Sequence, residues 1–164
     1  MDRHPFRVAV EADDEAAVTA LLHEEVEFRS PAVHRPYQGR AVVAHLLHHA
    51  KATLTGLTYI DELHGDGTVA LLFTARVGDK DVEGLDHLTL DDDGRITRLR
   101  VMIRPLSGLI ATAQAMGARL EEDPFESPAS GDRAQPAATE PGQRRPSPAA
   151  GEDRPGGQNT SRGM

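Results

Sequence analysis

Residues 57–104 read LTYIDELHGDGTVALLFTARVGDKDVEGLDHLTLDDDGRITRLRVMIR, and this stretch decides the fold. Three short turn sequences divide it: Gly-Asp-Gly at 65–67, Gly-Asp-Lys at 78–80 and Asp-Asp-Gly at 92–94. Glycine beside aspartate is typical of tight hairpin loops, because both residues tolerate the backbone conformations that such loops need. The segments between the turns are rich in apolar and β-branched residues. We therefore expect four consecutive strands joined by hairpins, which form an antiparallel meander.

The sequence on either side of the meander predicts four helices and one more strand. Pro5 suits the first turn of a short helix, and apolar residues at helical spacing predict a second helix before residue 23. Apolar and charged residues alternate over 25–30, which is typical of a strand. The stretch 40–54 carries a broad apolar stripe, which predicts a third helix. Pro105, like Pro5, suits the first turn of a helix, so we expect a closing helix that begins there. This order of elements predicts an α+β domain over residues 1–121.

Residues 122–164 differ in composition from the rest of the chain. They hold seven of the eleven prolines and many glycines, with almost no large apolar residues. Such a segment buries too little surface to offset the entropy lost on ordering, so we expect a disordered Pro/Gly-rich tail.

Charge and composition exclude several classes of protein. The formal net charge of −8 argues against a nucleic-acid partner, which requires a clustered excess of Lys and Arg. Acidic residues interrupt residues 1–30, so no signal or membrane segment is expected there. The chain has no cysteine, which excludes disulfides and thiolate chemistry and is compatible with a cytoplasmic location.

Two local signatures resemble ketosteroid isomerase-like proteins of the nuclear transport factor 2-like superfamily. One is Phe-Arg-Ser-Pro at 28–31, followed by Gly39 and the helical sequence AVVAHL. The other is Leu-Asp-His-Leu-Thr-Leu at 85–90, followed by an acidic glycine turn and a further strand. The closing helix is similar to that of SnoaL-like members. The resemblance implies a cone-shaped, curved antiparallel sheet, wrapped by three helices from the N-terminal half and one C-terminal helix, that encloses an apolar pocket.

Side-chain alternation then predicts which residues face that pocket. In residues 81–90, Asp86 shares a strand face with Leu88. In residues 95–104, Leu99, Val101 and Ile103 share one face of the next strand, and we expect both faces to line the same pocket. A carboxyl group that points into an apolar pocket is costly when charged, so we expect a raised pKa for Asp86. By resemblance, Asp86 takes the place of a protonated aspartate that donates a hydrogen bond to a developing enolate.

The other isomerase groups do not carry over by resemblance. The position of the base, just before the proline that ends the first strand, is Ser30, and the position of the helical tyrosine is Phe6. Neither a serine hydroxyl without an activator nor a phenyl ring supplies the missing chemistry. Gly84 likewise occupies the position at which a related epoxide hydrolase branch has an arginine. We therefore expect neither the known steroid isomerisation mechanism nor epoxide opening.

Several further residues are candidates for the pocket. Asp61 lies two residues after Tyr59, so the two share a strand face if the strand is regular, and Asp61 is then a second pocket carboxylate. His34 and Tyr37 lie in the loop that rims the pocket mouth in this family. We expect catalytic roles for Asp86, Asp61 and His34. Expected substrate contacts are Phe28, Ser30, Tyr37, Tyr59, Leu88, Leu99, Val101 and Ile103.

Metal sites are not expected from the sequence. His45, His48 and His49 lie on one expected helix, and His45 and His49 have the i, i+4 spacing of a zinc-binding pair. No third ligand is evident nearby, so a solvated helix face is favoured for these histidines over a metal site. The acidic run at 91–94 lacks the spacing of a calcium loop and is interpreted as a hairpin turn. No cofactor is expected.

Two classes of function follow. The first is a cofactor-independent isomerase, cyclase or dehydratase of secondary metabolism, acting on a polyketide-, terpenoid- or steroid-like molecule through Asp86. The alternative is a ligand-binding or dimerising accessory protein without catalysis. In either case a homodimer through the outer sheet face is expected, with Leu85 and Met102 as candidate contacts.

Overall fold

A computed structural model describes residues 2–126 of the 164 residues. Most of the predicted tail, residues 127–164, therefore lies outside the described residues. Residues 122–126 are described, and they belong with the α+β domain, because the last helix extends to Glu122 and the residues after it contact the helix at 40–53. No helix in this part of the chain is both long and apolar enough to span a membrane.

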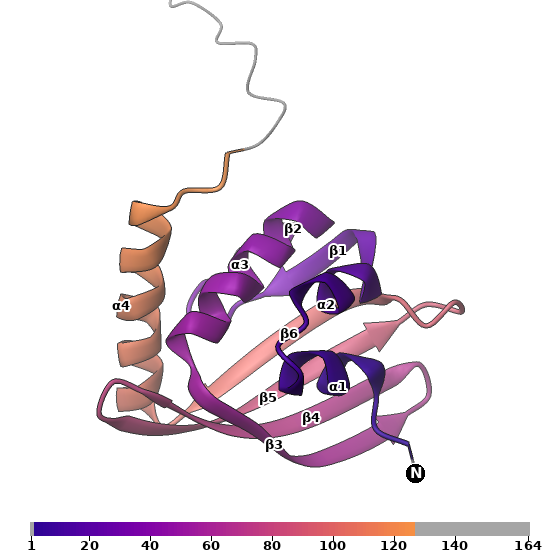
Figure 1. The fold of residues 1–164 in the computed structure, drawn as a ribbon, viewed down its shortest axis with the longest axis horizontal. Helices are drawn as coiled ribbons and strands as arrows, with labels where there is room; N and C mark the ends of the chain where they lie inside the picture. The colour runs from indigo at the N-terminus through magenta and orange to yellow at the C-terminus, as the bar shows by residue number, and fades with distance from the viewer. Residues whose placement is uncertain (1, 127–164) are drawn as a thin grey trace, which may run out of the picture. The chain divides into compact units, whose positions relative to one another are not determined.

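The described chain contains four helices and six strands (Figure 1). Their bounds are α1 Pro5–Glu11, α2 Glu15–Leu21, β1 Leu22–Arg29, β2 Tyr37–Gln38, α3 Arg40–Thr53, β3 Thr55–Gly65, β4 Thr68–Val77, β5 Lys80–Leu90, β6 Ile96–Arg104 and α4 Leu106–Glu122. The four-strand meander and the α+β class are confirmed. Strand β2 was not expected, because its two residues carry no strand pattern of their own and are recognised as a strand by their pairing with β1.

The strands form one open sheet in the order β2-β1-β6-β5-β4-β3. The expected antiparallel pairing is found between all neighbouring strands except β1 and β6, which pair in parallel. The reason is topological: β1 is not joined to β6 by a hairpin, and the chain returns to it only after β2, α3 and three more strands. Parallel pairing requires such a long crossover.

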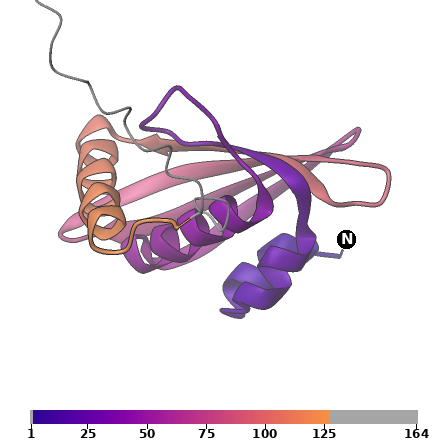
Figure 2. The same ribbon diagram turned by 90° about the horizontal axis from the view of Figure 1, so that it is seen from above.

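The helices cover one face of the sheet. In Figure 2, α1, α2 and α3 lie against that concave face and α4 stands at one end of it. The starts of the two short helices have local causes: the Asp14 carboxylate accepts the backbone N–H of Ala17 and caps α2, and Pro5 occupies the first turn of α1. Fully buried side chains from the sheet and helices form the core: Phe6, Leu22, Val26, Val43, Leu71, Phe73, Leu88, Ile96 and Leu99.

Gly84 on β5 makes room for a core aromatic ring. It lies opposite Phe73 of β4, and a Cβ atom added to Gly84 would overlap the Phe73 ring. The Phe73 side chain is 1% exposed, and its ring packs edge to face on that of Tyr59, with the centroids 6.1 Å apart. Gly84 therefore determines how two neighbouring aromatic side chains lie on the concave face.

Replacing Gly84 by Ala should destabilise the protein by about 1–3 kcal/mol, because the methyl group forces Phe73 out of its place in a close-packed core. Chemical denaturation followed by circular dichroism measures the change. Gly117→Ala is the matched control: this glycine lies in α4 with nothing within 4 Å of an added Cβ, so the substitution should be neutral or stabilising. Equal effects of the two substitutions would contradict the packing argument.

Candidate functional site

A cavity of about 790 Å³ lies between the concave face of the sheet and the helices. Its floor is formed by residues of β3 to β6, and its walls by all four helices and by the loop between β1 and β2. Most of the lining side chains are apolar. The larger ones are Phe6, Val10, Val18, Phe28, Leu46, Leu47, Leu54, Leu57, Phe73, Val101, Ile103, Leu109 and Met116.

Strand register determines which side chains form the floor. Tyr59, Phe73, Gly84 and Ile103 occupy one row across β3, β4, β5 and β6. Asp86 lies in the neighbouring row, two residues along β5 from Gly84, and pairs there with Val101. Because residues two apart share a face, the aromatic row and the carboxyl group look into the same space.

Asp86 is a buried carboxyl group with a tyrosine partner. Its side chain is 7% exposed, and that of Tyr59 is 3% exposed. The Tyr59 hydroxyl donates a hydrogen bond to Oδ2 of Asp86 at 2.7 Å, across the intervening strand β4. In the part of the chain that the structure describes, Tyr59 is the hydrogen-bonding partner found for the Asp86 side chain. The second oxygen, Oδ1, is therefore the one left for another partner.

Burial changes the protonation of both groups. It raises the pKa of Asp86 from 3.8 to about 7, and the hydrogen bond from Tyr59 opposes this shift. Burial also raises the pKa of Tyr59 well above its ordinary value, and the negative charge and hydrogen bond of Asp86 act in the same direction. Near neutral pH, Tyr59 is thus a neutral phenol, and Asp86 exists in both protonated and ionised forms.

The side of the cavity between α2 and α3 is lined by paired polar side chains. Asp13 forms an ion pair with Lys51, and Nδ1 of His48 lies 2.8 Å from Oε1 of Glu15. These groups are partly or largely exposed to solvent. They connect the start of α2 to α3 and give the cavity a polar margin, in contrast to its apolar interior.

Seven of the predicted site residues line the cavity. These are Asp86 and the expected contacts Phe28, Ser30, Tyr37, Tyr59, Val101 and Ile103. Phe6, at the position where the resemblance implies a lost tyrosine, lines it as well. The structure therefore places the inward faces of β5 and β6 and the loop after β1 around one cavity. The hydrogen bond between Tyr59 and Asp86 was not predicted, because no sequence signal indicated it.

Asp61 lies elsewhere, and the prediction that it shares a face with Tyr59 is wrong. The register with β4 shifts between the two residues: Tyr59 pairs with Phe73, and Asp61 pairs with Leu72, the next residue along β4. This irregularity inserts Ile60 as an extra residue and turns Asp61 to the outer face, as β-bulges do. Asp61 is exposed, and its carboxylate accepts the backbone N–H of Glu62.

Three more predicted residues do not line the cavity. His34 is exposed in the loop between β1 and β2, some of whose other residues do contribute to the lining. Leu88 and Leu99 pair with each other and are fully buried. That end of the sheet is filled by packed core side chains, so the two leucines face the core.

The histidines of α3 are placed differently from one another. The prediction of a solvated helix face holds for His48, which is exposed, but it is wrong for His49, whose exposed fraction is 7%. The residue that follows α4, Asp123, lies against His49. The sequence separation of 74 residues explains why helical spacing alone did not reveal this contact.

Comparison with known proteins adds to the geometry. A family model described as a SnoaL-like domain matches residues 3–99. No curated protein matches the chain. A solved structure of a steroid delta-isomerase from Pseudomonas aeruginosa is 39% identical, with a TM-score of 0.69, and the match covers 71% of this chain and 87% of that one.

Two further solved structures are similar. An uncharacterised protein with a cystatin-like fold from Silicibacter pomeroyi is 32% identical over 73% of this chain and 84% of that one, with a TM-score of 0.69. The epoxide hydrolase/cyclase-like enzyme SalBIII, described in connection with pyran ring formation in the polyether salinomycin, is 18% identical over 63% of this chain and 87% of that one, with a TM-score of 0.53. At that identity the last similarity shows the fold alone.

Proposed function

Because the chain belongs to the SnoaL-like domain family, within the nuclear transport factor 2-like superfamily, we propose that it binds a small hydrophobic ring compound in its cavity and catalyses a cofactor-independent isomerisation, cyclisation or dehydration. A polyketide-, terpenoid- or steroid-like molecule suits the mostly apolar lining. The observation that carries the proposal is the buried Asp86 carboxyl group, held by Tyr59 at the floor of that cavity.

Asp86 is the acid or hydrogen-bond donor of the proposed reaction. With Tyr59 donating to Oδ2, the proton of the acid form resides on Oδ1 and is available to a carbonyl or hydroxyl oxygen of the ligand. A pKa of about 7 leaves much of the group protonated at neutral pH, and proton transfer is efficient when the pKa of the acid is close to the working pH. Tyr59 positions the carboxyl group and stabilises its ionised form after the proton has left.

The alternative function is binding without catalysis, and Ser30 is the observation that favours it. Ser30 lines the cavity at the position where the resemblance implies a base, and a serine hydroxyl does not accept a proton without an activating group. Two acidic lining residues that could otherwise act as a base, Asp13 before α2 and Glu15 in it, are already paired with Lys51 and His48. A homodimer through the outer sheet face also stays a prediction; Leu85 and Met102 are paired there on adjacent strands.

The proposal is tested with cyclic β,γ-unsaturated ketones and β-hydroxy ketones of one to four rings. Isomerisation of the first class and dehydration of the second both give a conjugated enone, which is followed by its ultraviolet absorbance, and mass spectrometry detects cyclised products. We expect protein-dependent turnover of at least one compound. Saturable binding without turnover across the panel would favour the binding function instead, and the absence of both would overturn the proposal for this cavity.

A further inference from the structure

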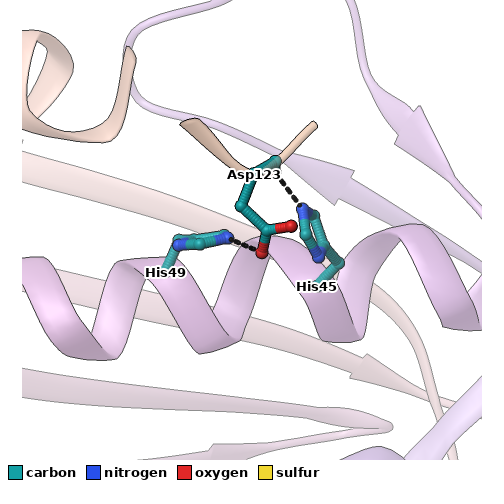
Figure 3. Close-up of side chains that lie close together, drawn as sticks. All are labelled: His45, His49 and Asp123. Atoms are coloured by element: carbon teal, nitrogen blue, oxygen red, sulfur yellow. Dashed lines mark hydrogen bonds and ion pairs between the residues drawn. The ribbon is translucent and has the colours of Figure 1, made fainter. Parts of the chain in front are cut away.

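Two histidine side chains on α3 converge on the residue that follows α4 (Figure 3). His45 and His49 lie one helical turn apart, and their rings pack edge to face with centroids 4.7 Å apart. Nε2 of His49 lies 3.0 Å from Oδ2 of Asp123, and Nε2 of His45 lies 2.9 Å from the main-chain oxygen of Asp123. The same nitrogen of each imidazole is thus directed at one residue from a distant part of the chain.

The Asp123 carboxylate supplies what the histidine pair lacks in the sequence. A ligand nitrogen of each histidine and a carboxylate oxygen of Asp123 all lie within 4.8 Å of one another. His49 is buried and His45 half-buried, whereas the Asp123 side chain is 64% exposed. The group is therefore anchored on the helix and open to solvent on the aspartate side, so an ion has a route of entry.

We propose that His45, His49 and Asp123 bind one divalent transition-metal ion, with Zn²⁺ as the preferred ion. Two imidazole nitrogens and one carboxylate oxygen are ligands that Zn²⁺ accepts, and water completes the four-coordinate shell. Tetrahedral Zn²⁺ with bonds of about 2.0–2.1 Å places its ligand atoms about 3.4 Å apart. The proposal therefore requires the side chains to rotate toward one another on binding, and the exposed Asp123 side chain is free to do so, while His45 exchanges a main-chain oxygen for the metal.

Metal binding at this site requires His45 to free its Nε2. A main-chain oxygen only accepts hydrogen bonds, so Nε2 of His45 carries a proton in the metal-free hydrogen bond. Coordination through Nε2 requires that proton to leave or to move to Nδ1. The bound ion ties α3 to the end of α4, two elements that each contribute residues to the cavity wall.

The simpler role for the same groups is a hydrogen-bonded clamp that holds the end of α4 without any metal. Both roles predict that loss of Asp123 loosens the contact between the helices. Only the metal site predicts saturable binding of one ion per chain that depends on all three residues.

The test uses the full chain without an affinity tag, since a histidine tag binds the same ions. Co²⁺ is titrated and followed by its visible absorption bands, and Zn²⁺ is titrated by calorimetry, in both cases with the metal salt alone. The variants are His45→Gln and Asp123→Asn, which change side chains that are not in the core. The control is His48→Gln, which removes a histidine of the same helix that is paired with Glu15 instead.

We expect one equivalent of each ion to bind. The affinity should fall at least about tenfold in both variants, because each loses a direct ligand and the loss of even an outer-shell group commonly costs about 10–100-fold. The control should bind as the unaltered chain does, and Zn²⁺ should raise the melting temperature of the unaltered chain and the control only. Absence of saturable binding would overturn the proposal. So would binding that survives in both variants, or that is lost equally in the control.

Discussion

Replacing Asp86 by Asn is expected to lower the rate of enone formation about 10²–10⁴-fold, which is the contribution typical of a general acid or base. An amide has nearly the same shape as a carboxyl group, still accepts a hydrogen bond from Tyr59, and donates an N–H bond, but it transfers no proton. Ligand affinity, measured by calorimetry, should therefore change little while turnover is lost. Unchanged turnover in this variant would show that Asp86 is not the acid.

The pH profile separates this role from a purely structural one. Turnover requires the protonated form of Asp86, so kcat/KM should decline as pH rises through about 7. The hydrogen bond from Tyr59 lowers the pKa of Asp86, so Tyr59→Phe should move the decline to higher pH. A variant that only loosened the fold would lower the rate without moving this midpoint.

Asp86→Asn is also expected to make the protein more stable at alkaline pH relative to the unaltered chain. In the unfolded chain, Asp86 loses its proton near its ordinary pKa of 3.8, whereas in the folded chain burial holds the proton until about pH 7. Between these values the folded state binds more protons, so stability falls as pH rises. The loss is on the order of 4 kcal/mol in total and about 3 kcal/mol between pH 5 and pH 8, from about 1.4 kcal/mol per pKa unit.

Urea denaturation of both proteins at pH 5, 6, 7 and 8 measures this effect. Other groups change the stability in the opposite direction. A hydrogen bond from Arg29 holds the pKa of Glu27 below its ordinary value, so Glu27 adds stability as pH rises through the acidic range in which it loses its proton. Such contributions cancel when the two proteins are compared at each pH. A stability difference that stays constant from pH 5 to pH 8 would mean that the Asp86 carboxyl group is not desolvated in the folded protein.

The candidate site divides into a part that local sequence predicts and a part that it does not. Alternation along β5 was sufficient to place Asp86 on the concave face, because a regular strand turns every second side chain to the same side. The same argument failed for Asp61, because an irregularity in the pairing of β3 with β4 reverses the alternation after Tyr59. A bulge arises from hydrogen bonding between strands, and the sequence of one strand does not reveal it.

By itself, the sequence determined the order of the helices and of every strand except β2, the four-strand meander and the inward direction of Asp86, because these depend on residues only a few positions apart. Tertiary structure alone decided the parallel pairing of β1 with β6, the partnership of Tyr59 with Asp86 and the meeting of His45 and His49 with Asp123. Those contacts join residues 27 to 78 positions apart. They form because burying the apolar faces of all the elements at once allows one arrangement of strands and helices, and no local pattern contains that information.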